Sequence, residues 1–333
     1  MNPHSPTRSF QTQPVPPTSI PAPVAEWSRL HIGTLSPWPL PTDLSGARSW
    51  RVSTPQGLVD IRIGRTDVDF RREVHAHRVA VRHLGPSHGP RLIAAEPRLR
   101  TLLTTQPRGR PVDDTAALHI LPRIHQDAGH LLRVLHDRAD GIPDAQAQAV
   151  RHTTQLTQRV LRMLSGITTW INPEEVETVR RCAISLLQRA ADLPFGFCHG
   201  TFGTPCWRWS VQGQTLSLAS FGRAQVLPTV ADFARTATLW AERPHLGDAF
   251  FTGYGRAITN DEQLVLDDAA VLAGVEDLHH AVWLRDSDAL SSAGAALRTA
   301  IRRRTCDPPQ PGSPRPAGPG PQLPDGPPGV PAP

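Results

Sequence analysis

Lysine is absent from the 333-residue sequence, so arginine carries every permanent positive side-chain charge. No lysine ammonium can therefore hold a phosphate group anywhere in this chain. The formal net charge is only +5, and arginine and acidic residues are interspersed, which favours a mixed, solvated surface over a nucleic-acid partner. The abundance of alanine, proline and arginine indicates a GC-rich, bacterial type of composition.

Cysteine and long hydrophobic runs are also scarce. The four cysteines, Cys182, Cys198, Cys206 and Cys306, lack paired spacing and are predicted to be reduced thiols rather than disulfide or zinc ligands. No apolar run is long enough to span a membrane, and the first residues lack the apolar core of a signal peptide. We therefore expect a cytoplasmic protein with no membrane partner.

Histidine is frequent, with 15 residues. None of them has the H-E-x-x-H spacing of a zinc hydrolase, and the sequence contains no G-x-S-x-G nucleophile motif. The histidines are therefore interpreted as surface residues on helices.

Composition changes along the chain and predicts four parts. Residues 1–24 are rich in proline, serine, threonine and glutamine, and residues 306–333 are mostly proline and glycine. Such segments bury too little apolar surface to offset the entropy of ordering, so we expect both to be disordered. Residues 25–107 carry mainly strand signals, and residues 108–305 mainly helical signals.

The strand-rich part has a regular order of signals. A turn at Pro55-Gln56-Gly57 predicts a hairpin, and Asp67 is predicted to cap the helix that follows. A hinge is expected at residues 106–109. The predicted strands are 50–54, 58–63, 91–95 and 99–105.

Apolar spacings of three and four residues predict helices over most of the second part. Asn172-Pro173-Glu174-Glu175 has the cap, the proline and the acidic residues of a strong helix start, and Asn260 is a second predicted cap. The predicted helices are 123–138, 144–164, 172–191, 229–240, 245–254, 260–286 and 290–304.

The chain is organised around residues 195–235. An apolar strand at 195–198 leads into His199-Gly200, and strands at 207–211 and 216–219 form a hairpin. A loop with Phe221-Gly222 then leads into a helix that is predicted to begin near Pro228.

This order of motifs resembles the catalytic core of the aminoglycoside phosphotransferase and choline kinase family, which reads H-G-D-x-x-x-x-N and then I-D-F/W-G/E. The helical segment A-G-H-L-L-R-V-L-H is similar to another family motif, and the resemblance covers about residues 27–304. It implies a two-lobed, protein-kinase-like α+β fold, with a small β-rich lobe at 25–107 and a mostly helical lobe at 108–305.

The sequence departs from the family pattern at three positions. Thr201 stands at the catalytic aspartate, Cys206 at the metal-binding asparagine and Ser220 at the second metal-binding aspartate. A threonine hydroxyl is unionised at neutral pH and cannot act as a base, and a thiol is too soft a ligand for Mg²⁺. No catalytic residue is therefore predicted to be intact and no metal site is expected; the degenerate positions are His199, Thr201, Cys206 and Ser220.

The resemblance also implies a vestigial nucleotide site in the small lobe. The family pairs a strand lysine with a helix glutamate, and Arg62 and Glu73 stand at those positions. Gly46, in segment 43–49, is the candidate glycine of a loop that covers the phosphates. The alternatives are an ion pair that only links the strand to the helix, and an ordinary hairpin turn.

Other residues of the core stretch are interpreted as structural. His199 is expected to hydrogen-bond to backbone around its turn. Asp232 resembles the acid of the family's D-x-A-R helix, which ties the catalytic loop to the large lobe. Trp207, Trp209 and Trp240 are expected to pack in the core.

The hypothesis for function is a pseudokinase-type binding or regulatory protein whose small-molecule or protein partner is unknown. The alternative is an active phosphotransferase that uses non-standard residues on a small hydroxylated metabolite or an aminoglycoside, and ATP and Mg²⁺ are expected as cofactors only in that case. A third hypothesis is an inactive remnant. The fold predicts that Thr201, Cys206 and Ser220 converge in the interlobe cleft, with the 207–219 hairpin under the hinge and Arg62 in ion-pair reach of Glu73.

Overall fold

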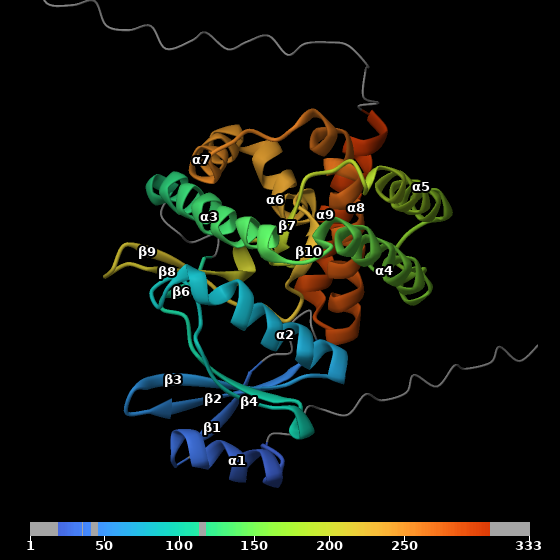
Figure 1. Cartoon of the computed structure of the whole chain (residues 1–333). Coiled ribbons are helices and arrows are strands. Elements are labelled where there is room, and N and C mark those ends of the chain that lie inside the picture. Colours follow the sequence, from blue (N-terminus) through green and yellow to red (C-terminus); the bar gives the residue numbers. More distant parts are fainter. Residues whose placement is uncertain (1–18, 35, 41–45, 113–117, 307–333) are drawn as a thin grey trace, which may run out of the picture.

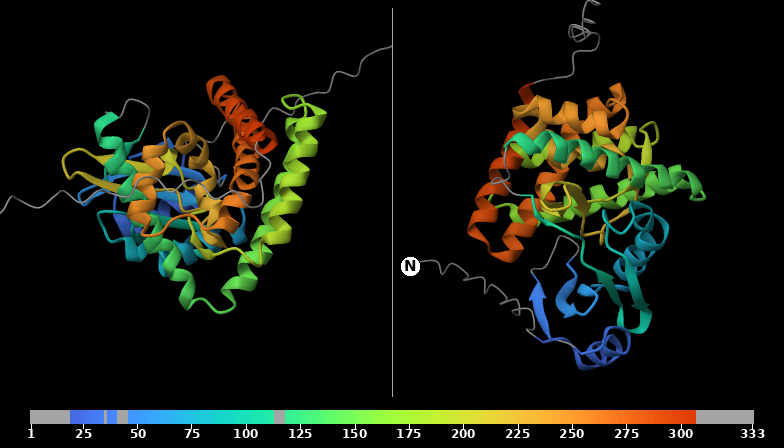
Figure 2. Two further views of the ribbon diagram at one scale, coloured as in Figure 1. Left: turned by 90° about the horizontal axis from the view of Figure 1, so that it is seen from above. Right: turned by 90° about the vertical axis from the view of Figure 1, so that its left-hand side faces the viewer.

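The computed structural model describes residues 19–34, 36–40, 46–112 and 118–306. They form two lobes, a smaller one built on a five-stranded sheet and a larger, mostly helical one (Figure 1, Figure 2). The two-lobed α+β architecture expected from the resemblance is confirmed. The predicted disordered ends lie mainly outside the described residues.

The small lobe is an antiparallel sheet with the strand order β1-β2-β3-β5-β4. Side chains alternate between its faces, so Trp50, Ile61 and Leu103 pack under α1 while Arg51 and Asp60 face the large lobe. The elements are α1 (Ala22–Ile32), β1 (Pro37–Leu40), β2 (Arg48–Thr54), β3 (Gly57–Ile63), α2 (Asp67–Val79), β4 (Leu92–Glu96) and β5 (Thr101–Thr105).

The large lobe packs its helices around one extensive core, and it also carries two small sheets. One sheet pairs β6, β8 and β9, and the other pairs β7 with β10. The elements are β6 (Arg110–Pro111), α3 (Leu121–His136), α4 (Ala145–Ile167), α5 (Pro173–Arg189), β7 (Phe195–Cys198), β8 (Trp207–Ser210), β9 (Thr215–Leu218), β10 (Gln225–Pro228), α6 (Val230–Glu242), α7 (Pro244–Tyr254), α8 (Asn260–Leu284) and α9 (Ser287–Cys306).

The predicted elements are confirmed with small shifts at their ends. The capping box at Asn172 is present, with its side chain accepting from the Glu175 amide at 2.9 Å. Thr66 rather than Asp67 caps α2. Thr259 rather than Asn260 caps α8, because its side chain accepts from the Glu262 amide and Glu262 reaches back to the Thr259 amide.

Helix α1 and the strands β1, β6 and β10 were not predicted from the sequence. Helix α1 begins at Ala22, inside the proline-rich segment that was expected to be disordered. Strand β10 occupies residues that were assigned to a loop and a helix start, and it pairs antiparallel with β7 from Gln225↔Cys198 to Pro228↔Phe195. This pairing fixes the loop between Phe221 and Gln225 behind the turn at His199-Gly200.

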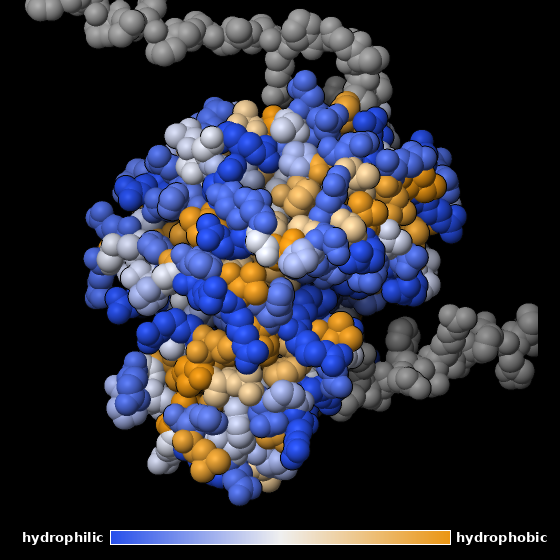
Figure 3. Space-filling model, viewed as in Figure 1, coloured by the Kyte–Doolittle hydropathy of each residue, from blue (hydrophilic) through white to orange (hydrophobic). Residues whose placement is uncertain are grey.

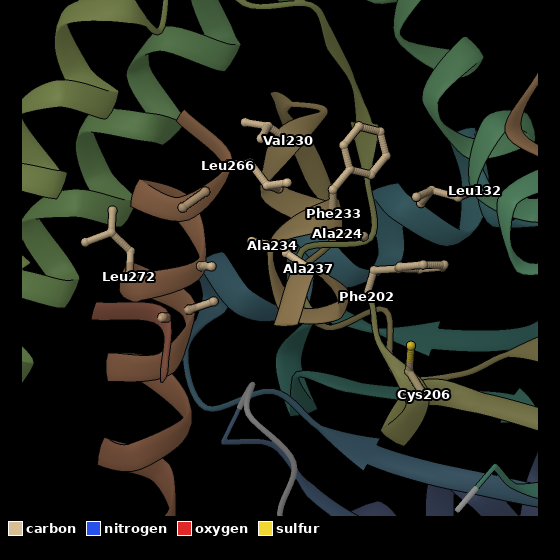
Figure 4. Close-up of a cluster of buried hydrophobic side chains, with 14 of the residues drawn as sticks. Leu132, Phe202, Cys206, Ala224, Val230, Phe233, Ala234, Ala237, Leu266 and Leu272 are labelled. Carbon is tan, nitrogen blue, oxygen red and sulfur yellow. The ribbon is translucent and has the colours of Figure 1, made fainter. Parts of the chain in front are cut away.

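The core of the large lobe contains Phe202, Phe233 and Leu132, and Cys206 belongs to the same cluster (Figure 4). Trp207 and Trp240 are buried and Trp209 is half-buried and packed against the core, which confirms their structural role. Among the described residues, the free cysteines Cys182, Cys198 and Cys206 are buried, in agreement with reduced thiols.

The interpretation of the histidines as surface residues is wrong for several of them. His77, His125, His136 and His199 are buried, where desolvation penalises the charged imidazolium. Burial, together with the positive charge of nearby Arg62, accordingly lowers the pKa of His77 to about 3.

The outer surface is mixed, as the charge pattern predicts. On the face shown in Figure 3, hydrophilic residues spread over both lobes and hydrophobic residues form small groups between them. None of the described helices combines the length and the apolar character needed to cross a bilayer.

Candidate functional site

A cavity of about 720 Å³ lies between the lobes, a size that suits a small-molecule ligand. Thr201, Cys206 and Ser220 all line it, so their predicted convergence is confirmed. The 207–219 hairpin lies under the hinge as expected, because β6, directly after the hinge, pairs with β8 through Arg110↔Trp209.

The small-lobe wall of the cleft carries the predicted ion pair. Arg62 Nε lies 2.7 Å from Glu73 Oε1, and the two side chains are only 12% and 4% exposed. The predicted ion pair between Arg62 and Glu73 is therefore confirmed, and it connects strand β3 with helix α2. Gly46 has a left-handed φ of 73° and is not among the described residues that line the cavity, while residues 43–45 of its predicted loop lie outside the described residues.

A second ion pair on this wall was not predicted. Arg51 donates to both carboxylate oxygens of Asp60, with Nε–Oδ1 at 2.7 Å and Nη2–Oδ2 at 3.0 Å. The sequence did contain a signal for it. The hairpin pairs Thr54 with Gly57, and counting back along the two strands sets Arg51 opposite Asp60.

The loop after β7 holds His199 by both of its ring nitrogens. Nε2 lies 2.8 Å from the Ala219 carbonyl, which can only accept, so Nε2 carries the proton. Nδ1 is then an acceptor, and the Thr201 amide and hydroxyl approach it at 3.4 and 3.3 Å. His199 is thus structural as expected, and the Thr201 hydroxyl is turned toward the ring as a donor.

Cys206 and Ser220 do not form a magnesium site. The Cys206 thiol donates to the Gly203 carbonyl at 3.0 Å and is 3% exposed. Ser220 has a left-handed φ of 68°, a conformation that favours glycine, asparagine and aspartate over serine. Neither side chain supplies a carboxylate or amide oxygen, which are the protein ligands Mg²⁺ prefers.

Asp232 anchors the same loop from helix α6 and is fully buried. Its carboxylate accepts from the amides of His199 and Gly200 at 2.7 and 2.8 Å, and His136 Nε2 lies 3.1 Å away. Burial alone would raise the pKa of Asp232, but the hydrogen bond and charge of His136, with the other donors, lower it. The predicted tie between the loop and the large lobe is confirmed.

One cluster has the composition of a metal site. In the described part of the chain, only His136, Cys198 and Asp232 bring three potential metal ligands together. These groups already have partners: His136 Nδ1 contacts the Tyr254 hydroxyl at 2.7 Å, and the Cys198 thiol points at the Leu227 carbonyl at 3.5 Å. Protein groups therefore occupy the positions that an ion would need.

The cleft does contain carboxylates, but each is already neutralised. Among the described lining residues these are Asp60, Glu73 and Asp277. Asp60 and Glu73 are paired as above, and Asp277 accepts from Arg235 Nε at 3.2 Å. The donor set of the cleft thus does not fit a divalent metal.

Among the described residues that line the cleft, arginines outnumber carboxylates. Arg208 donates to the carbonyls of Pro205 and Trp207 at 3.0 and 3.3 Å, and none of the described carboxylates forms an ion pair with it. Burial lowers the pKa of Arg208, and repulsion by Arg51 lowers it further. The arginines that line the cavity are Arg51, Arg62, Arg208, Arg223 and Arg235. This excess of positive charge favours an anionic ligand.

Solved structures confirm the architecture. The gentamicin complex of APH(2")-IIa aligns with a TM-score of 0.58 and 12% identity over 84% of this chain and 96% of that chain. Choline kinase from Cryptosporidium parvum aligns with a TM-score of 0.59 and 10% identity over 85% of this chain and 94% of that chain. A type I macrolide 2'-phosphotransferase aligns with a TM-score of 0.54 and 15% identity over 83% of this chain and 94% of that chain. At these identities the likeness shows a shared fold.

Sequence comparison is more specific about the family. No curated protein matched the chain significantly. The sequence model of the phosphotransferase enzyme family matches residues 39–265, which include the Arg62–Glu73 pair and the loops that carry Thr201 and Ser220. Because this match spans well over half of the chain, the protein belongs to the phosphotransferase enzyme family.

Proposed function

We propose that this chain is a pseudokinase-type binding or regulatory protein, which takes an anionic small molecule into the interlobe cleft and does not catalyse magnesium-dependent phosphoryl transfer. One observation carries the proposal. Every described carboxylate that lines the cleft is paired with an arginine, and Thr201, Cys206 and Ser220 offer no other carboxylate or amide.

The missing groups correspond to the main requirements of the reaction. Phosphoryl transfer depends on positioning, on metal ions that neutralise the phosphates and on a residue that orients the nucleophile. Thr201 donates its hydroxyl to His199 and cannot accept a proton at neutral pH. Loss of a positioned base alone typically costs about 10²–10⁴ in rate, before the loss of metal ligands is counted.

Binding, in contrast, needs only the cleft and its positive charge. Arg208, which forms no ion pair with a described carboxylate, is available for a ligand carboxylate or phosphate. Arg62 and Glu73 are then the remnant of a phosphate grip, in which a guanidinium replaces the ammonium of the family.

Thermal-shift titrations test the proposal with ATP, ADP and pyrophosphate as anionic probes, each with Mg²⁺ and with EDTA. We expect at least one probe to raise the melting temperature equally in both conditions, because a ligand that binds only the folded state stabilises it. Arg208→Gln should weaken the shift, and the exposed Arg110→Gln on neighbouring β6 should not. A shift seen only with Mg²⁺, or none with any probe, would contradict the proposal.

A further inference from the structure

A second cavity, of about 30 Å³, lies among α4, α6 and α8, behind the turn at Gly200. Arginine dominates its polar lining, which consists of Arg72, Arg159, Arg223, Arg235, Gln225 and Glu276. It shares two arginines with the interlobe cleft, but Thr201, Cys206 and Ser220 do not line it.

Glu276 is the centre of this arginine cluster. Its Oε1 lies 2.6 Å from Arg223 Nη1 and 3.2 Å from Arg159 Nη2, and its Oε2 lies 3.0 Å from Arg235 Nη2. The carboxylate is 3% exposed, so its interactions with the three guanidinium groups are largely shielded from water. One carboxylate therefore forms ion pairs with three arginines, which come from α4, from the loop before β10 and from α6.

The charges around the cavity do not balance. Arg72 is paired with Asp69 at 2.6 Å, and Arg235 has Asp277 as a second partner at 3.2 Å. Arg159 and Arg223 then share Glu276, so the described residues around the cavity carry one positive charge in excess. Burial lowers the pKa of Arg159, and repulsion by Arg223 and Arg72 acts in the same direction. The attraction by Glu276 opposes these effects but does not cancel them.

We propose that this cavity binds a small inorganic monoanion, of the size of chloride, as the missing counter-ion of Arg159 and Arg223. The volume is sufficient for a group about as large as a water molecule. Leu156, Leu227 and Leu272 form apolar walls that offer no hydrogen bonds to compete with the guanidinium groups. This site would exist whether or not the cleft is catalytic.

Bound anion would link the two lobes. Arg72 comes from α2 of the small lobe, next to Glu73 of the cleft pair, and its Nε donates to the Gly222 carbonyl at 3.1 Å. Arg159 comes from α4 of the large lobe. An anion between these cations replaces mutual repulsion by attraction, so it stabilises the contact of α2 with the loop behind the cleft.

The test titrates chloride against gluconate at constant ionic strength and follows the melting temperature of the full chain. We expect a saturable rise of about 2–4 °C with chloride. Arg159→Gln removes the excess charge, so its melting temperature in gluconate should stay close to that of the wild type while the chloride response disappears. Arg162→Gln, at an exposed position on the same helix, is the matched control and should retain the response.

Two results would overturn the proposal. One is a wild-type melting temperature that is the same in chloride and gluconate, and the other is an Arg159→Gln protein with the full chloride response. A crystallographic measurement covers the case in which the variant does not fold. Wild-type crystals in bromide should show anomalous density in the cavity between Arg159 and Arg223, and its absence at saturating bromide would equally refute the site.

Discussion

Replacing Glu276 by glutamine should strongly lower the stability of the protein. The substitution keeps the shape of the side chain but removes the negative charge that Arg159, Arg223 and Arg235 share. Removal of one partner from a buried ion pair typically costs about 3–5 kcal/mol, because the remaining charge stays buried without compensation.

The pKa of Glu276 gives a second measure of how much its negative charge contributes to the free energy of unfolding. Burial alone would raise this pKa, but Arg223, Arg235 and Arg159 lower it from 4.5 to about 2. At about 1.4 kcal/mol per pKa unit, the ionised carboxylate contributes roughly 3 kcal/mol to folding. Because the folded-state pKa is the lower one, this stability is present above pH 4.5 and is lost as the pH falls toward 2.

Urea denaturation from pH 7 to pH 3 measures both effects. We expect Glu276→Gln to lower the free energy of unfolding by about 3 kcal/mol at pH 7 and to reduce the loss of stability on acidification below pH 4.5. The exposed Glu242→Gln is the matched control and should behave as the wild type. A loss below about 1 kcal/mol at pH 7, or an acid dependence equal to that of the wild type, would refute the account of the cluster.

Three further outcomes follow from contacts around the core and the cleft. Asp232→Ala leaves the buried amide of His199 and the part-buried amide of Gly200 without an acceptor and should lower the free energy of unfolding in urea by about 2–5 kcal/mol. Gly253→Ala places a methyl group against a backbone carbonyl of α3 and should cost more than about 2 kcal/mol, whereas Gly141→Ala meets open space and should be tolerated, as melting temperatures will show. Thr201→Asp combined with Ser220→Asp should not restore ATP turnover, because Cys206 still replaces a metal ligand. Strong magnesium-dependent activity of that double variant would show that the two restored aspartates are sufficient for phosphoryl transfer without a metal ligand at Cys206.

Much of this fold could be predicted from local sequence signals. Hairpin turns, helix caps and apolar spacing act over a few residues, and so four of the five small-lobe strands and most helices were placed within a few residues of their ends. Thr201, Cys206 and Ser220 were expected in the cleft because the motifs follow one another in a fixed order, and Arg62 was expected beside Glu73 for the same reason.

Other features depend on long-range contacts that no local pattern indicates. Strand β10 ends in Pro228 and is only four residues long, so its sequence resembles a helix start until β7 provides a partner. Helix α1 lies among prolines and is held by the apolar face of the small-lobe sheet through Val24. The ion-pair partners of Glu276 are the arginines at positions 159, 223 and 235, and only tertiary packing brings them together.

The central claim is that the cleft binds without catalysing magnesium-dependent phosphoryl transfer, and ATP turnover by the purified wild-type chain tests it most directly. The assay supplies Mg²⁺ and a panel of aminoglycosides, choline-like alcohols and sugars. We predict no turnover above the protein-free background, because Thr201, Cys206 and Ser220 provide neither base nor metal ligand. Metal-dependent turnover of any acceptor, abolished when Ser220→Trp fills the cleft, would contradict the claim and establish an active phosphotransferase.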